Sequence, residues 1–228
     1  ADIFNHKIRK IATTLASGST TNDATLPLIF TTSKATTDFA VDDITVTNGV
    51  LSSFSGSGTT YTVNFTPTLD GAVTINVPAD AYTDAAGNPN TAATEFIWTY
   101  DGTAPTVTIT LTDSFLTSAS PIPITITFDE DVTGFEISDI NIGNGTADNF
   151  TIWPTASGTY YTIDVTPTAE SLVTVDIAAG VCMDAAGNSN TAATQFSITY
   201  DTTALTITIA TTLEITPEVT TFAGSGSA

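Results

Sequence analysis

The chain has 228 residues, with 24 acidic residues against four basic ones and a net charge of −20. This excess of negative charge argues against binding to nucleic acid or to anionic membrane surfaces, because both carry the same sign of charge. Hydrophobic residues make up 41% and charged residues only 12%, so the chain can bury a core and is not an acidic disordered segment.

The single cysteine and the single histidine, His6, exclude an intrachain disulfide and most triad, acid–base and zinc chemistry. No apolar run approaches the roughly 18 residues of a membrane helix. The chain begins at Ala1, which is expected of a processed protein or of a piece excised from a longer one. The 50 threonines favour strands, since threonine is β-branched. These features predict an all-β protein that is secreted or exposed on a cell surface.

Strands are expected wherever apolar and polar residues alternate, because successive side chains of a strand point to opposite faces. In chain order, this pattern predicts strands at 61–66, 73–77, 96–100, 161–165, 173–177, 196–200 and 205–213. No amphipathic helix is apparent. About seven short strands in each hundred residues, separated by Gly, Asn and Pro turns, are typical of Ig-like antiparallel sandwiches.

The chain repeats itself with an offset of 100 residues. The stretch that begins Asp84-Ala-Ala-Gly-Asn88 recurs as Asp184-Ala-Ala-Gly-Asn188. Upstream the offset falls to 96, and the four-residue difference is expected to be a loop insertion between Gly49 and Tyr61. The predicted fold is therefore two tandem Ig-like antiparallel β-sandwiches, at 1–100 and 101–200. Residues 201–228 would supply an extra C-terminal strand, and the short linkers predict a rod.

The ordered motifs of each module resemble the bacterial Ig-like repeat. The motifs are the run from Phe135 to Gly145, the Tyr-Thr strand at 161–167, the Asp184–Asn188 turn and the linker Asp101-Gly-Thr-Ala-Pro105. This resemblance covers most of both modules. It implies a module of a large cell-surface or secreted protein, commonly an adhesin stalk. The opening of module 1 departs from the pattern, because it lacks the Asp-x-Thr-Ala-Pro junction.

Two sets of oxygen-bearing side chains are candidate calcium ligands, since calcium prefers carboxylate and amide oxygens. The first set is Asp84, Asn88, Asp101 and Asp43, and the second is Asp184, Asn188, Asp201 and Asp139. The alternative is mechanical: Asp and Asn close a tight turn in which Gly supplies a positive φ. The cluster Asp129-Glu130-Asp131 could be a strand edge, a calcium ligand or a glycosidase carboxylate pair.

Other side chains have a functional and a structural interpretation. Trp153 is either packed in a loop or in contact with a ligand or partner. Cys182 is expected to be a small buried side chain rather than a redox group. Three asparagines match the N-glycosylation pattern, namely Asn64, Asn144 and Asn149, but abundant threonine makes chance matches expected.

Residues 205–213 resemble the first strand of a module that does not follow. The apolar positions are Leu205, Ile207, Ile209 and Leu213. The strand could be frayed because a longer array was cut, it could pair back onto module 2, or it could be donated to another molecule.

The predicted function is non-enzymatic. The first hypothesis is a stalk or spacer segment of a bacterial cell-surface adhesin, whose partners are neighbouring Ig-like modules or copies of itself and possible host-surface ligands. The second is a subunit of an extracellular filament joined by strand donation. The third is a carbohydrate- or protein-binding module. No cofactor is expected apart from the possible calcium.

Overall fold

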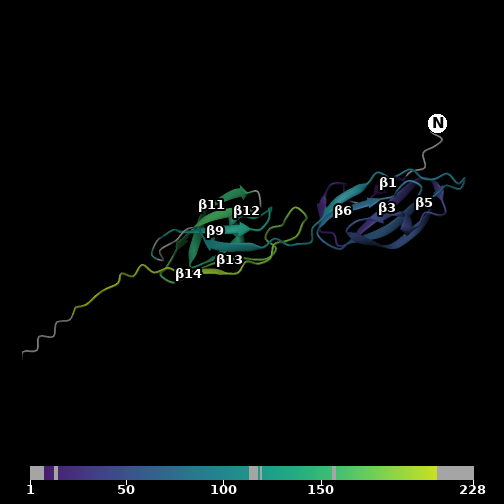
Figure 1. The fold of residues 1–228 in the computed structure, drawn as a ribbon. Coiled ribbons are helices and arrows are strands. Elements are labelled where there is room, and N and C mark those ends of the chain that lie inside the picture. Colours follow the sequence, from purple (N-terminus) through teal and green to yellow (C-terminus); the bar gives the residue numbers. More distant parts are fainter. Residues whose placement is uncertain (1–7, 13–14, 113–117, 119, 156–157, 210–228) are drawn as a thin grey trace, which may run out of the picture.

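The computed structural model describes residues 8–12, 15–112, 118, 120–155 and 158–209. These residues form two β-sandwiches that lie end to end, joined by a short linker (Figure 1). The prediction of tandem all-β modules is confirmed. The described residues contain no α-helix, only two 3-10 turns, η1 (Val41–Asp43) and η2 (Ile137–Asp139), and no helix among them is long and apolar enough to cross a bilayer.

Module 1 is built from two sheets. One sheet has the order β1-β3-β5, with β1 at Ile8–Ala12, β3 at Leu26–Thr36 and β5 at Gly49–Pro67. The other has the order β2-β7-β6-β4, with β2 at Thr20–Thr21, β7 at Phe96–Tyr100, β6 at Gly71–Asn76 and β4 at Thr45–Val46. All pairs are antiparallel except β2 and β7, which run parallel.

Module 2 repeats this plan with one difference. Its first sheet has the order β8-β9-β12-β11, with β8 at Val107–Leu111, β9 at Ile122–Phe128, β12 at Gly158–Pro167 and β11 at Gly145–Thr155. Its second sheet has the order β10-β13-β14, with β10 at Ile140–Gly143, β13 at Leu172–Ile177 and β14 at Phe196–Thr199. In the described residues, no strand takes the place beside β14 that β2 takes beside β7.

Each module has its own core, formed by the inward side of the alternating strands. In module 1, Phe30, Phe65 and Val73 are fully buried, and Phe39 meets the ring of Tyr61 edge to face with centroids 5.0 Å apart. In module 2, Phe128, Val165 and Val175 are buried, and Phe135 meets Tyr161 in the same way at 4.9 Å. Two separate cores allow each sandwich to be stable by itself.

The four-residue difference between the modules lies in a hairpin. In module 1, the single strand β5 folds back on itself, which brings Gly49 against the ring of Phe65. A side chain at position 49 would collide with that ring. In module 2, β11 and β12 form a longer hairpin, in which Pro154 pairs with Thr159. Trp153 therefore lies in a strand, and its expected position in a loop was wrong. The extra residues lengthen paired strands, because each ladder bond satisfies backbone groups that a loop would leave to solvent.

The chain leaves module 2 at the end opposite the linker and runs outward as an extended segment (Figure 1). Its apolar side chains are almost fully accessible, with exposed fractions of 92% for Leu205, 82% for Ile207 and 85% for Ile209. Leu213 lies outside the described residues.

Candidate functional site: the junction between the sandwiches

The turn at Asp184–Asn188 is closed by its aspartate. The Asp184 carboxylate accepts backbone hydrogen bonds from Ala186 at 2.8 Å, Gly187 at 2.7 Å and Asn188 at 2.8 Å. Gly187 has a φ of 95°, a conformation that glycine adopts without strain. The carboxylate thereby satisfies three N–H groups that a turn leaves free, which explains why Asp, Gly and Asn occur at these positions.

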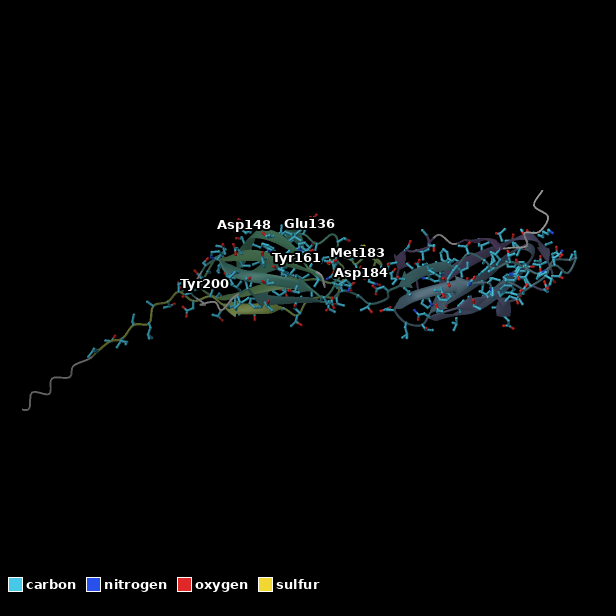
Figure 2. All side chains as sticks on the ribbon, turned by 45° about the horizontal axis from the view of Figure 1, so that its top comes forward. Glu136, Asp148, Tyr161, Met183, Asp184 and Tyr200 are labelled. Atoms are coloured by element: carbon cyan, nitrogen blue, oxygen red, sulfur yellow. The ribbon has the colours of Figure 1, made fainter. Side chains whose placement is uncertain are left out.

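This turn is the part of module 2 that contacts module 1 (Figure 2). The side-chain amide of Asn22 donates to Asn188 Oδ1 at 3.1 Å, and the Asn22 backbone N–H donates to the Ala186 carbonyl at 3.2 Å. Asn188 in turn donates to the Asp101 carbonyl at 2.9 Å and to Asp184 Oδ2 at 2.8 Å. Asn188 therefore links the turn, the end of module 1 and the start of the linker.

The linker is held at both of its ends. On the module 1 side, the Asp70 carboxylate accepts a bond from the Gly102 N–H at 2.7 Å and another from the Thr103 hydroxyl. On the module 2 side, the Asp129 carboxylate accepts bonds from the Thr106 N–H at 2.8 Å and from its hydroxyl at 2.6 Å. Together with the direct contacts between the modules, these anchors restrict the hinge freedom of the linker.

Three carboxylates gather at the same junction. Asp101, Glu130 and Asp184 each offer an oxygen within 4.8 Å of the others, and Asp184 is buried. Burial, together with the negative charge of Asp184 and Asp101, raises the pKa of Glu130 to about 6. Oxygen ligands at this spacing suit a hard divalent cation such as calcium.

This group differs from both calcium sets expected from the sequence. Asp101 and Asp184 come together, but they come from different sets. Asp201 follows Tyr200 at the opposite end of module 2 (Figure 2). The carboxylates of Asp43 and Asp139 accept backbone bonds from Ala40 and Glu136, both at 2.8 Å, and so close the 3-10 turns.

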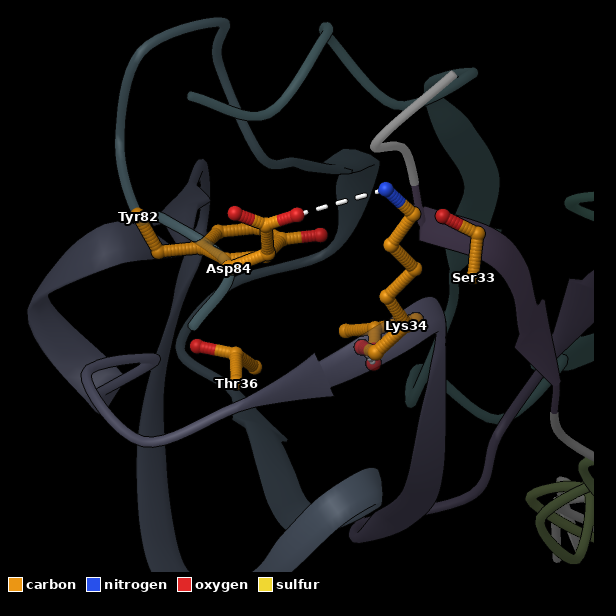
Figure 3. Close-up of a pocket in the computed structure, with 6 residues that line it drawn as sticks. Ser33, Lys34, Thr36, Tyr82 and Asp84 are labelled. Carbon is orange, nitrogen blue, oxygen red and sulfur yellow. Dashed lines mark hydrogen bonds and ion pairs between the residues drawn. The ribbon is translucent and has the colours of Figure 1, made fainter. Parts of the chain in front are cut away.

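Asp84 and Asn88 form the equivalent turn of module 1, where a lysine lies near the aspartate. Lys34 forms an ion pair with Asp84 at 3.3 Å, beside a small cavity that Tyr82 also lines (Figure 3). The pKa of the Asp84 carboxyl is well below its usual range, first because the Asn88 backbone N–H donates to it. The positively charged Lys34 thus lies beside Asp84 in module 1, whereas a second acidic residue, Glu130, lies beside Asp184 in module 2.

The other residues singled out in the sequence are a tryptophan, a cysteine and three asparagines, and each of them contacts other parts of its own module. Trp153 is 48% exposed and stacks on Tyr160 with centroids 6.1 Å apart. Cys182 is buried, and burial raises the pKa of its thiol to about 11. The side-chain amides of Asn144 and Asn149 donate to the Ala169 carbonyl and to Asp164, and Asn64 is half-buried on β5.

The segment that follows module 2 is anchored like the linker between the modules. The Glu170 carboxylate accepts bonds from the Thr202 N–H at 3.1 Å and from the Thr203 hydroxyl at 3.1 Å, as Asp70 does for Gly102 and Thr103. Sequence reasoning did not find Asn22, Asp70, Glu130 or Glu170 as junction residues. Two signals were present in the sequence: an acid at both positions of the 100-residue offset for Asp70 and Glu170, and the acid cluster 129–131, already a candidate calcium ligand, for Glu130.

A family model described as a bacterial Ig-like domain matches residues 7–98 and again residues 101–200. The chain belongs to the bacterial Ig-like domain family. This confirms the resemblance noted in the sequence. No curated protein matches the sequence of this bacterial Ig-like chain.

Several solved structures are similar in fold to this pair of bacterial Ig-like modules. The Escherichia coli adhesin FdeC is 13% identical with a TM-score of 0.43, over 85% of this chain and 62% of FdeC. Invasin, a bacterial integrin-binding protein, is 14% identical with a TM-score of 0.42, over 75% of this chain and 37% of invasin. InvD from Yersinia pseudotuberculosis is 16% identical with a TM-score of 0.38, over 89% of this chain and 60% of InvD. The chain thus spans less than two thirds of each of these structures.

Proposed function

We propose that this chain is a non-enzymatic spacer of a bacterial cell-surface adhesin, in which Ig-like modules are stacked end to end. The observation that carries the proposal is the repetition of the junction. The Asp184–Asn188 turn contacts module 1, and module 1 has the same turn at 84–88. The linker bound by Asp70 likewise recurs as the segment bound by Glu170 after module 2. Module 1 therefore has a second copy of the docking turn, and module 2 has a second copy of the anchored segment.

The proposal predicts a rod whose two modules keep a fixed orientation. We would measure this orientation in residues 1–228 by small-angle X-ray scattering, together with the variant Asn188→Ala. A single elongated shape that broadens into a flexible distribution in the variant is the expected result. A freely hinged wild-type chain would overturn the idea of a stiff spacer.

The same measurement with calcium and with a chelator addresses the carboxylates of the junction. Asp101, Glu130 and Asp184 repel one another, and a cation between them would tighten the contact of the modules. Narrowing of the distribution in calcium, lost in Glu130→Gln, supports a cation at this position. Identical scattering curves in calcium and in chelator would mean that these three carboxylates bind no calcium that affects the orientation of the modules.

A binding role has one observation in its favour. Ile152 and Trp153 are 54% and 48% exposed on the β11–β12 hairpin, beside Tyr160. Exposed aromatic faces can stack on sugars or bind a protein partner. Saturable binding in a glycan array that Trp153→Ala abolishes would favour this second function. Equal signals from both proteins would remove it.

A further inference from the structure

The outer face of the first sheet of module 2 carries a complete row of threonines. The sheet has the order β8-β9-β12-β11, and its register places one threonine of each strand side by side, namely Thr110, Thr125, Thr162 and Thr151. These side chains point away from the core, because residues between them on the same strands, such as Ile126, are buried. The row is therefore a line of hydroxyl and methyl groups that crosses the whole sheet on its outward side.

The neighbouring row adds two aromatic rings to this face. It runs across the same four strands from Thr108 through Thr127 and Tyr160 to Trp153. The rings of Trp153 and Tyr160 are within 11° of parallel, with centroids 6.1 Å apart. The Trp153 indole N–H donates to the Thr162 hydroxyl at 3.4 Å, and this bond helps to orient the indole. Because Trp153 still has an exposed fraction of 48%, its ring is both held in place and accessible to a ligand.

The equivalent face of module 1 has a different surface. There Ile29 pairs with Thr62 and Ala12 in one row, and Thr31 pairs with Thr60 in the next. None of these five residues is aromatic, and Ile29 has an exposed fraction of 42%. The aromatic pair and the unbroken threonine row are thus specific to module 2 and are not required by the fold that both modules share.

Both rows of module 2 are uncharged, although the chain as a whole carries a net charge of −20. The uncharged area ends one row further along the strands, where Asp148 pairs with Asp164. An acidic ligand would meet this pair and the negative charge of the whole chain. The charge distribution therefore favours a neutral ligand.

The chemistry of the two rows matches that of a sugar. A pyranose ring has C–H groups on its faces, which pack on an aromatic ring, and hydroxyls around its rim. A threonine hydroxyl can donate and accept, as each sugar hydroxyl can. The rows repeat about every 4.8 Å across the strands and lie about 6.7 Å apart along them, so an extended chain of sugars meets several hydroxyls at once. A protein partner would instead require an apolar centre, and hydroxyls surround the aromatic pair here.

We propose that this threonine–aromatic face, formed by the two rows, binds a neutral polysaccharide. One sugar ring stacks on Trp153, and the neighbouring sugars bond to the threonine hydroxyls beside it, with Thr127 the first of them. The proposal rests on the binding role given above as the second function and names its ligand class. The spacer function does not depend on it.

The first test is the quenching of tryptophan fluorescence by acrylamide in residues 1–228. Trp98 has an exposed fraction of only 3%, so quenching reports mainly on Trp153. The probes are three soluble neutral polymers, a β-glucan, a xylan and a galactomannan, and two acidic ones, alginate and hyaluronate. The expected result is saturable protection of Trp153 by a neutral polymer, with the same affinity at low and high salt because no charges are paired.

Two outcomes of this test would overturn the proposal. Protection by none of the neutral polymers would remove the face as a polysaccharide site. Protection by an acidic polymer alone would show that the ligand class is wrong, while the binding role itself would remain. In either case the scattering measurement of the rod is unaffected, so failure here is distinguishable from failure of the spacer function.

The second test separates stacking from a general hydrophobic contact. Trp153→Phe keeps an aromatic face, whereas Trp153→Leu keeps only an apolar side chain, and calorimetric titration with the neutral polymer measures both. The affinity should fall about tenfold in Trp153→Leu and clearly less in Trp153→Phe, because a stacked ring contributes beyond its buried area. Equal affinities of Trp153→Leu and the wild type would contradict stacking and would instead fit an apolar contact of the kind that a protein makes.

The third test addresses the hydroxyls. Thr127→Val removes one hydroxyl beside the aromatic pair and keeps the β-branched shape, so the strand should be preserved. The affinity should fall roughly threefold to tenfold, as expected for one net hydrogen bond. The matched control is Ile29→Ala, which truncates an exposed side chain on the equivalent face of module 1 and should leave the affinity unchanged. An equal loss in the control, or no loss in Thr127→Val, would contradict binding at this face.

Discussion

The side-chain amide of Asn22 donates a hydrogen bond of 3.1 Å to Oδ1 of Asn188, across 166 residues of the chain. This contact joins the last loop before β3 in module 1 to the Asp184–Asn188 turn of module 2. Asn188 also donates to the Asp101 carbonyl, so one side chain touches three segments of the junction. The stiffness of the pair should therefore depend on Asn188.

Asn188→Ala should uncouple the two modules, since it removes bonds to Asn22, Asp101 and Asp184. Each net hydrogen bond contributes about 1 kcal/mol, so module 2 should lose about 1–2 kcal/mol in urea unfolding. The control is Asn88→Ala, which removes bonds within the module 1 turn only. Residual dipolar couplings of the two modules should become independent in Asn188→Ala and stay correlated in Asn88→Ala. Correlated couplings in both would show that the linker alone sets the orientation.

Glu130→Gln should stabilise module 2 at neutral pH. Burial and the neighbouring acids raise the Glu130 pKa to about 6 in the folded state, above its ordinary value of 4.5. The folded state therefore binds the proton more tightly than the unfolded state. This group's contribution is fully present below pH 4.5 and is lost as the pH rises through 6.

Glutamine cannot ionise, so Glu130→Gln keeps the stability that the wild type loses as Glu130 ionises. The free energy of unfolding should therefore be higher in the variant at pH 7–8, by less than about 1 kcal/mol because Glu130 is partly exposed. Urea unfolding at pH 5 and at pH 7.5 measures it. A similar gain at both pH values would mean that the carboxylate is not strained by its neighbours.

Tyr82→Phe should leave module 1 unchanged or stabilise it by up to about 1 kcal/mol. The Tyr82 hydroxyl is buried and bonds to none of the described residues, and burial raises its pKa to about 12. The matched change is Tyr61→Phe, since Tyr61 donates to the Thr36 carbonyl at 2.9 Å. That change should cost about 1 kcal/mol. Thermal unfolding of both variants measures which change lowers the stability of module 1 more. A larger loss of stability in Tyr82→Phe would mean that the Tyr82 hydroxyl has a hydrogen-bond partner.

Asp84→Ala should destabilise module 1 more than Lys34→Ala does. The aspartate accepts bonds from the Ala86 and Asn88 N–H groups, whereas the ion pair is partly exposed and screened by solvent. Because the folded pKa of Asp84 is lowered, its stabilising effect exists above pH 3.8 and fades as the pH falls further. Urea unfolding at neutral pH compares the two variants. Equal losses would assign the effect to the ion pair.

The sequence by itself determined the two sandwiches. The period of two in stretches such as 61–65 and 161–165 selects which residues enter the core, and that pattern depends only on local strand geometry. The 100-residue repeat determined the number of modules, and the Asp84 and Asp184 turns follow from short-range bonds that any such motif makes. Even the extended run at 205–209 is visible in the alternation of its residues.

The tertiary structure alone decided which distant groups meet. Asp101, Glu130 and Asp184 come from three separate segments, and nothing in their spacing predicts their approach. Trp153 was expected in a loop, yet the added residues extend the β11–β12 hairpin, because pairing satisfies their backbone groups. The pairing of residues 17–21 with the edge of β7 is equally invisible in the sequence, since it uses backbone N–H and C=O groups that every residue shares. Which of these groups pair over long sequence distances depends on how the whole chain folds, because the groups themselves are the same in every residue.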